Sequence, residues 1–91
     1  MNDALVLHLI LEYQYYEAID RGEKTVEYRD NTLYWRRRII PKWNSNGGNK
    51  VVFHRGYTKT TMTFELKDAV FNGGTIELHL GARQGDVIHD V

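Results

Sequence analysis

Three charged side chains, Lys24, Glu27 and Arg29, stand close together in residues 22–30, GEKTVEYRD. Arg29 can donate two parallel hydrogen bonds to a phosphate or carboxylate, whereas Lys24 offers a compact positive charge. Glu27 can accept a hydrogen bond from the exocyclic amine of a base or act as a general base. Strand alternation places Thr25 on the same face as Glu27 and Arg29. These residue types indicate a polar cleft, and the alternative is a solvated face with weak cross-strand ion pairs.

Lys24 is also a candidate nucleophile. A lysine attacks only as the neutral amine, which burial and neighbouring cations favour and a neighbouring carboxylate opposes. Strand alternation predicts that Glu27 faces away from Lys24 unless a bulge intervenes. If Glu27 does reach Lys24, the pair favours the ammonium form, and therefore phosphate binding over attack.

A second group combines aromatic rings with cations: Tyr34, Trp35 and the run Arg36-Arg37-Arg38. Single-stranded RNA is bound by such groups, because bases stack on rings and phosphates meet cations. Three consecutive arginines cannot all face one way, so at most two of them are expected to contact a ligand. The alternative is that Tyr34 and Trp35 plug one end of the fold while the arginines are solvated.

Arg55 and Tyr57 flank Gly56 at the end of a predicted strand. Tyr57 can stack on a base and Arg55 can bind a phosphate, so this strand end is a candidate far wall of the cleft. The glycine can equally well serve only to make a turn.

The four histidines, His8, His54, His79 and His89, do not predict a metal site. None of them has i, i+4 or His-x-His spacing, and the chain has no cysteines to assist. His8 and His79 fall in apolar strands and are expected to be hydrogen-bonded core or edge residues. We expect neither a metal nor another cofactor.

Hydrophobic periodicity predicts the helix and strands that must position these side chains. It predicts one helix at 13–21, which ends at Gly22, and strands at 5–11, 24–29, 50–55, 60–70 and 75–80. The almost continuous apolar run of the first strand predicts burial on both of its faces. Residues 31–40 fit either a short helix capped by Asn31 or Thr32 or the start of a strand, and residues 44–49 are typical of a flexible loop. Closing five strands into a small barrel removes exposed edges, so the predicted class is α+β, a β-barrel with one or two short helices.

Length and composition bound the possibilities. The 91 residues suffice for a single domain, and 42% apolar and 26% charged residues are an ordinary globular composition. A formal net charge of zero argues against a non-specific DNA coat protein. The absence of cysteine excludes disulfides and favours the cytoplasm, and the apolar run at 4–11 is too short to span a membrane.

Residues 16–29, YEAIDRGEKTVEYR, resemble the ASCH domain family of the PUA-like superfamily. The similarity consists of a helix, a Gly-x-Lys-Thr motif, an alternating strand and an arginine. Strands at 7–11, 51–56 and 76–81 also fit the family's order of elements.

The resemblance implies a β-barrel with a cleft beside the helix-to-strand turn, and an RNA-binding module. Some family members are enzymes: one branch hydrolyses 4-acetylcytidine and another resembles a ribonuclease. The lysine of the motif, here Lys24, is the nucleophile proposed for the amidohydrolase branch. A threonine three residues later assists it there, and this chain has Glu27 at that position. Glu65 and Glu77 are candidates for the distant glutamate that completes that site.

Three hypotheses follow. The first is an ASCH-like module that binds RNA or a modified nucleoside through Lys24, Thr25, Glu27, Arg29, Tyr34, Arg55 and Tyr57. The second is a hydrolase of the same fold, in which Lys24 acts with Glu27 on an acylated nucleoside, or with Arg29 and a tyrosine on RNA. The third is a protein-interaction module, which an exposed patch of Tyr34, Trp35 and Trp43 without a polar cleft would favour. A shared site requires the Lys24 amine within about 8 Å of the Glu27 or Arg29 head group.

Overall fold

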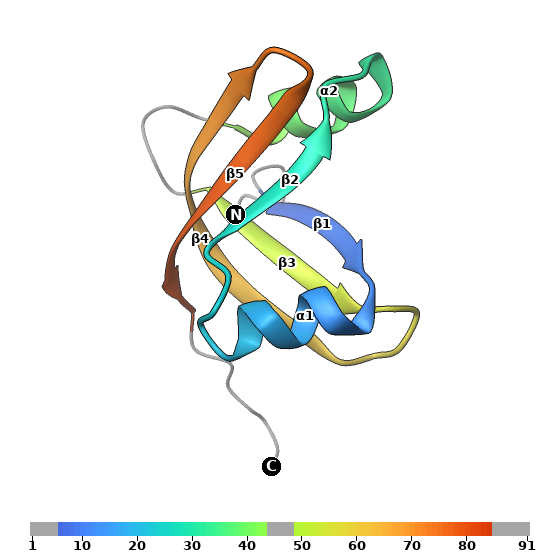
Figure 1. Cartoon of the computed structure of the whole chain (residues 1–91), viewed down its shortest axis with the longest axis vertical. Helices are drawn as coiled ribbons and strands as arrows, with labels where there is room; N and C mark the ends of the chain where they lie inside the picture. The colour runs from blue at the N-terminus through green and yellow to red at the C-terminus, as the bar shows by residue number, and fades with distance from the viewer. Residues whose placement is uncertain (1–5, 44–48, 85–91) are drawn as a thin grey trace.

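The computed structural model describes residues 6–43 and 49–84, which form a curled five-stranded sheet with two short α-helices (Figure 1). The elements in chain order are β1 (Val6–Leu11), α1 (Tyr13–Asp20), β2 (Val26–Asp30), α2 (Leu33–Ile39), a 3₁₀ turn (Ile40–Lys42), β3 (Lys50–Arg55), β4 (Thr61–Asn72) and β5 (Thr75–Arg83). The predicted order and the α+β class are confirmed. Of the predicted loop at 44–49, all but Asn49 lies outside the described residues.

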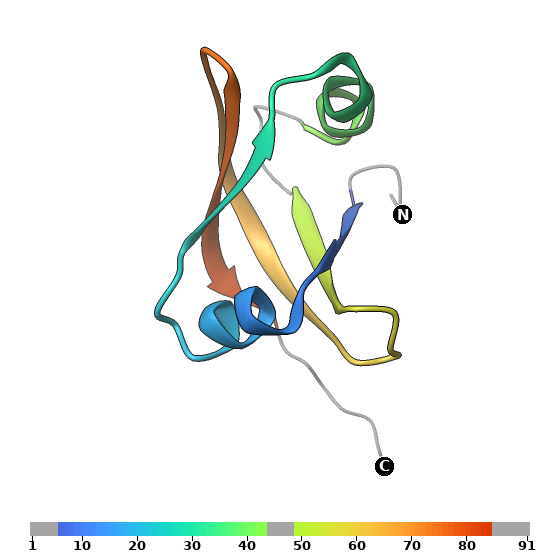
Figure 2. The same ribbon diagram turned by 45° about the vertical axis from the view of Figure 1, so that its right-hand side comes forward.

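The sheet has the strand order β1-β3-β4-β5-β2, in which β1 runs parallel to β3 and the other neighbours are antiparallel. The strands curl as a barrel does, but the edge strands β1 and β2 do not pair with each other in the described part of the chain. The predicted barrel is therefore a half-barrel (Figure 2). Register shifts in β4 between Phe64 and Leu66, and again between Leu66 and Asp68, mark bulges of the kind that bend a strand.

The core fills the concave side of this curled sheet. Its buried residues alternate along the strands and are joined by side chains from both helices: Leu7, Leu9, Leu11, Tyr16, Ile19, Ile39, Val51, Phe53, Met62, Phe64, Leu66, Ile76 and Leu78. The prediction that the first strand is buried on both faces is wrong, because His8 and Ile10 are exposed. Only one side of β1 faces the core, and His8 and Ile10 lie on its other side.

The two helices lie at opposite ends of the half-barrel (Figures 1 and 2). Helix α1 buries Tyr16 and Ile19 and ends at Asp20, one residue before its predicted end. Gly22 follows the helix as predicted, with a φ of 77° in the left-handed conformation that glycine adopts most readily. The ambiguous segment 31–40 is mostly a helix, α2. The Thr32 side chain caps it by accepting a hydrogen bond from the Trp35 amide at 3.3 Å.

Among the described residues, neither helix has the length and apolar character needed to cross a membrane.

Candidate functional site

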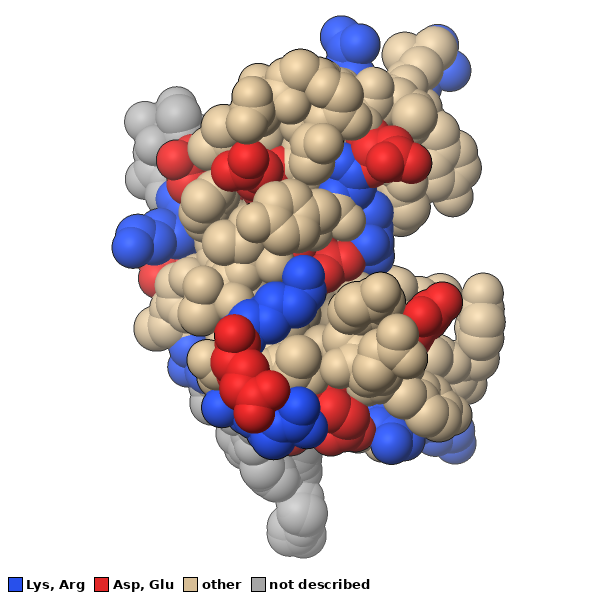
Figure 3. All heavy atoms as spheres, in the orientation of Figure 1, with Lys and Arg blue, Asp and Glu red and all other residues tan. Residues whose placement is uncertain are grey.

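An open cleft of about 1190 Å³ lies between the two helical ends of the half-barrel. Its walls come from β1, the start of α1, the segment 24–30 that includes β2, helix α2, and Gly56-Tyr57 in the β3–β4 turn. Figure 3 shows the surface hollowed between the part of the molecule that carries α2 and the part that carries α1. The cleft thus lies between the edge strands β1 and β2, which do not pair with each other in the described residues.

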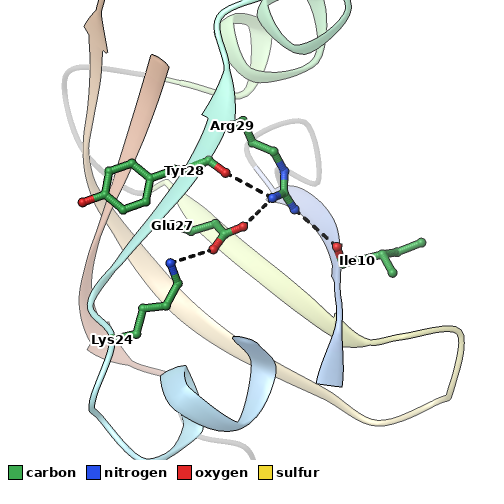
Figure 4. A network of polar contacts seen from close by, with 5 residues as sticks. All are labelled: Ile10, Lys24, Glu27, Tyr28 and Arg29. Atoms are coloured by element: carbon green, nitrogen blue, oxygen red, sulfur yellow. Dashed lines mark hydrogen bonds and ion pairs between the residues drawn. The ribbon is translucent and has the colours of Figure 1, made fainter. Parts of the chain in front are cut away.

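A buried glutamate anchors a polar network in this cleft (Figure 4). Glu27 is only 5% exposed, and its two carboxylate oxygens bind different cations. Oε1 lies 3.2 Å from the Lys24 ammonium, and Oε2 accepts a hydrogen bond from Nη1 of Arg29. Arg29 also donates from Nη2 to the Ile10 carbonyl on β1 at 3.3 Å. The network therefore links β2 to β1 across the gap of the half-barrel.

Lys24 meets Glu27 because the strand begins later than the sequence pattern predicts. The amides of Glu23 and Lys24 both donate to the Ala18 carbonyl, at 2.9 and 3.2 Å, so these residues still wrap around the end of α1. Strand β2 begins only at Val26, and strand alternation does not extend back to Lys24. The prediction that Lys24 and Glu27 face opposite ways is wrong, and the distance required for a shared site is met.

Aromatic rings surround the two cations. The Lys24 ammonium lies 5.1 Å from the centre of the Tyr28 ring and 5.9 Å from that of Tyr15. The Arg29 guanidinium lies 5.0 Å from the centre of the Trp35 ring. Contacts of this kind attract a cation to the face of a ring. Both Tyr15 and Tyr28 are about half exposed, so their rings are also open to a ligand.

Sequence reasoning missed Tyr15 and Tyr28 as site residues. Tyr15 lies in the predicted helix next to the buried Tyr16, yet it is 47% exposed and lines the cleft. Tyr28 belongs to the face of β2 opposite Glu27; strand alternation put it on the same face as Lys24, but not among the site residues. The Ile10 carbonyl was missed as well, because a backbone acceptor leaves no signal in residue type.

The floor of the cleft carries one positive charge in excess, since two cations share the single carboxylate of Glu27. Arg38 adds a further cation to the lining, whereas the exposed residues Glu12 and Asp30 balance the charge of the lining as a whole. The cleft therefore suits a ligand that combines one anionic group with neutral polar and aromatic parts.

The other predicted site residues divide into two groups. Tyr34 and Tyr57 line the cleft, and Tyr57 is 93% exposed. Thr25 is exposed and does not line the cleft, and its carbonyl accepts a hydrogen bond from the Leu80 amide at 3.0 Å. Arg55 does not line the cleft either, because its guanidinium binds Glu17 at 2.7 Å. Thr25 therefore helps to seat β2 against β5.

Arg55 holds the β3–β4 turn against α1. Its guanidinium lies 4.1 Å from the centre of the Tyr13 ring, and the hydrogen bond to Glu17 raises the pKa of Arg55. Gly56 has a φ of 58°, and a Cβ there would lie 2.7 Å from the Tyr13 ring. Only a glycine fits this position without strain, so the turn presents Tyr57 at the edge of the cleft.

Neither candidate for a distant catalytic glutamate lines the cleft. Glu77 accepts hydrogen bonds within its own region of the sheet, from His79 at 3.0 Å and Asn72 at 3.2 Å, and these bonds lower its pKa. Glu65 accepts a bond from the Ala82 amide at 3.3 Å and fills the space above Gly81.

The histidines His8 and His54 form a pair on neighbouring strands, with Nδ1 of His8 3.0 Å from Nε2 of His54. In the described ranges 6–43 and 49–84, no three side chains of His, Cys, Asp or Glu gather as a metal site would require. His79 binds Glu77 at 3.0 Å, and His89 lies outside the described residues.

His54 predicts a pH dependence of stability. Burial lowers the pKa of His54, and the neighbouring His8 ring lowers it further. The unfolded chain therefore binds more protons than the folded chain between the folded pKa and about 6.5, so stability is lost as the pH falls through this window. We expect the His54 imidazole to titrate below about 6.5 in an NMR titration. We also expect the free energy of unfolding in urea to change less between pH 7.5 and 5.5 in His54→Gln than in the native chain. A midpoint above 6.5 would contradict this assignment.

Fold and site together define a small α+β half-barrel domain with a cleft lined by cations and tyrosines. No protein-family model matches the chain, and no curated protein matches it significantly.

Proposed function

We propose that this domain binds RNA or a nucleotide in the cleft, with the phosphate or a polar edge of the ligand at Lys24 and Arg29. The observation that carries the proposal is the network of Lys24 and Arg29 around the buried Glu27, with its excess positive charge, in a cleft bordered by four tyrosines, Tyr15, Tyr28, Tyr34 and Tyr57.

Each part of this arrangement has a counterpart in a nucleotide. Cations attract phosphate oxygens, and Nη2 of Arg29 carries a second N–H besides the one that it donates to the Ile10 carbonyl. Nucleobases stack on exposed aromatic side chains, and Tyr57 is the most exposed of the tyrosines. Glu27 fixes both cations so that a ligand meets them already in position, which reduces the entropy lost on binding.

The ASCH resemblance is part of the same proposal. The motif Gly22-Glu23-Lys24-Thr25 lies at the turn between α1 and β2, beside the cleft. That is the position that the resemblance implies for the binding cleft, and the half-barrel is compatible with a PUA-like fold. The lack of cysteine supports placing the domain in the cytoplasm.

A hydrolase of the same fold is the second candidate. The observation in its favour is the contact between Lys24 and Glu27, the pair that would act on 4-acetylcytidine. In this ion pair Lys24 is the ammonium, whereas nucleophilic attack requires its free amine. Glu27 would therefore first have to accept a proton from Lys24. Binding without turnover is therefore the better-supported function.

The protein-interaction hypothesis has less support. It calls for an exposed aromatic patch and no polar cleft, whereas Trp35 and Trp43 are partly buried against the core and a polar cleft is present.

Titration with cytidine monophosphate and with a fluorescent single-stranded RNA tests the proposal. We expect binding of at least one of these ligands, and a loss of tenfold or more in Lys24→Ala and Arg29→Ala, because the phosphate loses a direct partner. Lys67→Ala is the control, since Lys67 is exposed on β4 and does not line the cleft. Absence of binding by both ligands, or equal losses in Lys24→Ala and Lys67→Ala, would overturn the proposal.

Incubation with 4-acetylcytidine tests the second candidate. Release of acetate by the native chain and its loss in Lys24→Ala would establish the hydrolase. Binding of nucleotides without acetate release would leave the binding function as proposed and exclude this substrate.

A further inference from the structure

Helix α2 carries a basic surface that lies mostly outside the cleft. Three consecutive arginines, Arg36, Arg37 and Arg38, are exposed on this helix. Among the ion pairs of residues 6–43 and 49–84, none involves these arginines. Figure 3 shows basic side chains projecting at the α2 end of the molecule. The guanidinium groups are therefore available to an anionic partner.

Helical geometry separates the three arginines. Successive residues of an α-helix are turned by about 100°, and Trp35 and Ile39 mark the side of α2 that faces the core. Arg38 then lies beside Tyr34 on the cleft side, and Arg37 points outward next to them. Arg36 falls on the flank away from Tyr34. The cleft lining agrees, because it includes Tyr34 and Arg38 but not Arg36 or Arg37.

Arg38 is held at the lip of the cleft. Its guanidinium lies 3.5 Å from the centre of the Tyr34 ring, and its Nη1 donates to the Tyr34 carbonyl at 3.1 Å. The Tyr34 ring in turn meets the Trp35 ring edge-on, at 5.0 Å between centres. An arginine fixed in this way loses little side-chain entropy when it binds a phosphate, and stacking leaves several of its N–H groups free.

We propose that Arg38 and Arg37 form a phosphate subsite on the α2 lip, so that the preferred ligand is a single-stranded oligonucleotide rather than a free nucleotide. One nucleotide occupies the cleft at Lys24 and Arg29, and the neighbouring phosphate lies against Arg38 and Arg37. This inference rests on the proposed function, because it extends a strand out of the same cleft. Cations next to an exposed ring favour a nucleic acid over an acidic peptide, which has no bases to stack.

The test compares ligand lengths in fluorescence anisotropy and competition experiments. The probes are a fluorescein-labelled eight-residue oligouridine, the same length of oligodeoxythymidine, uridine monophosphate and an eight-residue oligoglutamate. We expect the tighter-binding of the two oligonucleotides to bind at least tenfold more tightly than uridine monophosphate. Which of the two binds more tightly shows whether the domain prefers RNA or DNA. Arg37→Gln should weaken oligonucleotide binding about threefold and lower the salt slope by about 0.7, the value for one phosphate contact on a single strand.

Arg36→Gln is the matched control, because it removes the same charge from the same helix on the other flank. It should change oligonucleotide affinity less than twofold, and Arg37→Gln should leave binding of uridine monophosphate unchanged. Equal losses in Arg36→Gln and Arg37→Gln, an oligonucleotide no tighter than the mononucleotide, or equally tight binding of oligoglutamate would overturn the subsite. If the mononucleotide still binds, the proposed function stands; if no nucleotide or oligonucleotide binds, both fail.

Discussion

Replacing Glu27 with alanine should lower the free energy of unfolding by about 3 kcal/mol, because it leaves two cations without their shared counter-ion. The side chains of Lys24 and Arg29 are only 23% and 17% exposed, so water replaces the lost carboxylate incompletely. The link between β2 and β1 through Arg29 also loses the group that orients the guanidinium. For a domain of this size the loss corresponds to a fall in melting temperature of roughly 12–24 °C.

Urea unfolding at neutral pH measures this effect. The matched control is Glu23→Ala, which removes a glutamate from an ion pair with Arg21 at 2.9 Å whose side chains are 55% and 61% exposed. Water screens such an exposed pair, so Glu23→Ala should be close to neutral. If both variants lose the same stability, the Glu27 network does not hold the two edge strands together.

The second large effect is expected at Ile39, the residue that anchors α2. Its side chain is fully buried in the core, so truncation to alanine removes apolar contacts and leaves a cavity. We expect Ile39→Ala to cost about 3 kcal/mol of unfolding free energy in urea denaturation, within the range for such truncations. The lip residues Tyr34 and Arg38 sit on the same helix, so the packing of Ile39 also sets their position.

The next residue provides the control. Ile40 has the same side chain but is 51% exposed, so Ile40→Ala should change stability by less than about 0.5 kcal/mol. A small loss in Ile39→Ala, similar to that in Ile40→Ala, would mean that α2 is not fixed to the half-barrel by this contact.

Local features of the fold could be predicted from the sequence because their signals are local. Strand β3 has its predicted ends, Lys50 and Arg55, since the apolar run Val51-Val52-Phe53 is followed within three residues by Gly56, which breaks the strand. Helix α1 stops before Gly22, where a positive φ is needed. The number of strands predicted a closed barrel; the curling is confirmed, but the edge strands do not close it in the described part of the chain.

Features that depend on long-range pairing could not be predicted. Whether β1 and β2 pair depends on how strongly the sheet curls, which the register shifts in β4 affect and which the residue types of the edge strands do not indicate. The buried position of Glu27 and its contact with Lys24 depend on where β2 begins, a boundary shifted by the hydrogen bonds of residues 23 and 24 to Ala18. Lys24, Glu27 and Arg29 were singled out by type, but their geometry came only from the structure.

The gap between β1 and β2 has a consequence for how the domain responds to an occupant. These strands are the first and last in the sheet order, and the side chain of Arg29 spans them through its bond to the Ile10 carbonyl. A ligand that contacts both Arg29 and β1 would connect the two edge strands of the half-barrel. Occupancy of the cleft and resistance to unfolding are thereby coupled, so a ligand that binds here would raise the free energy of unfolding of the domain.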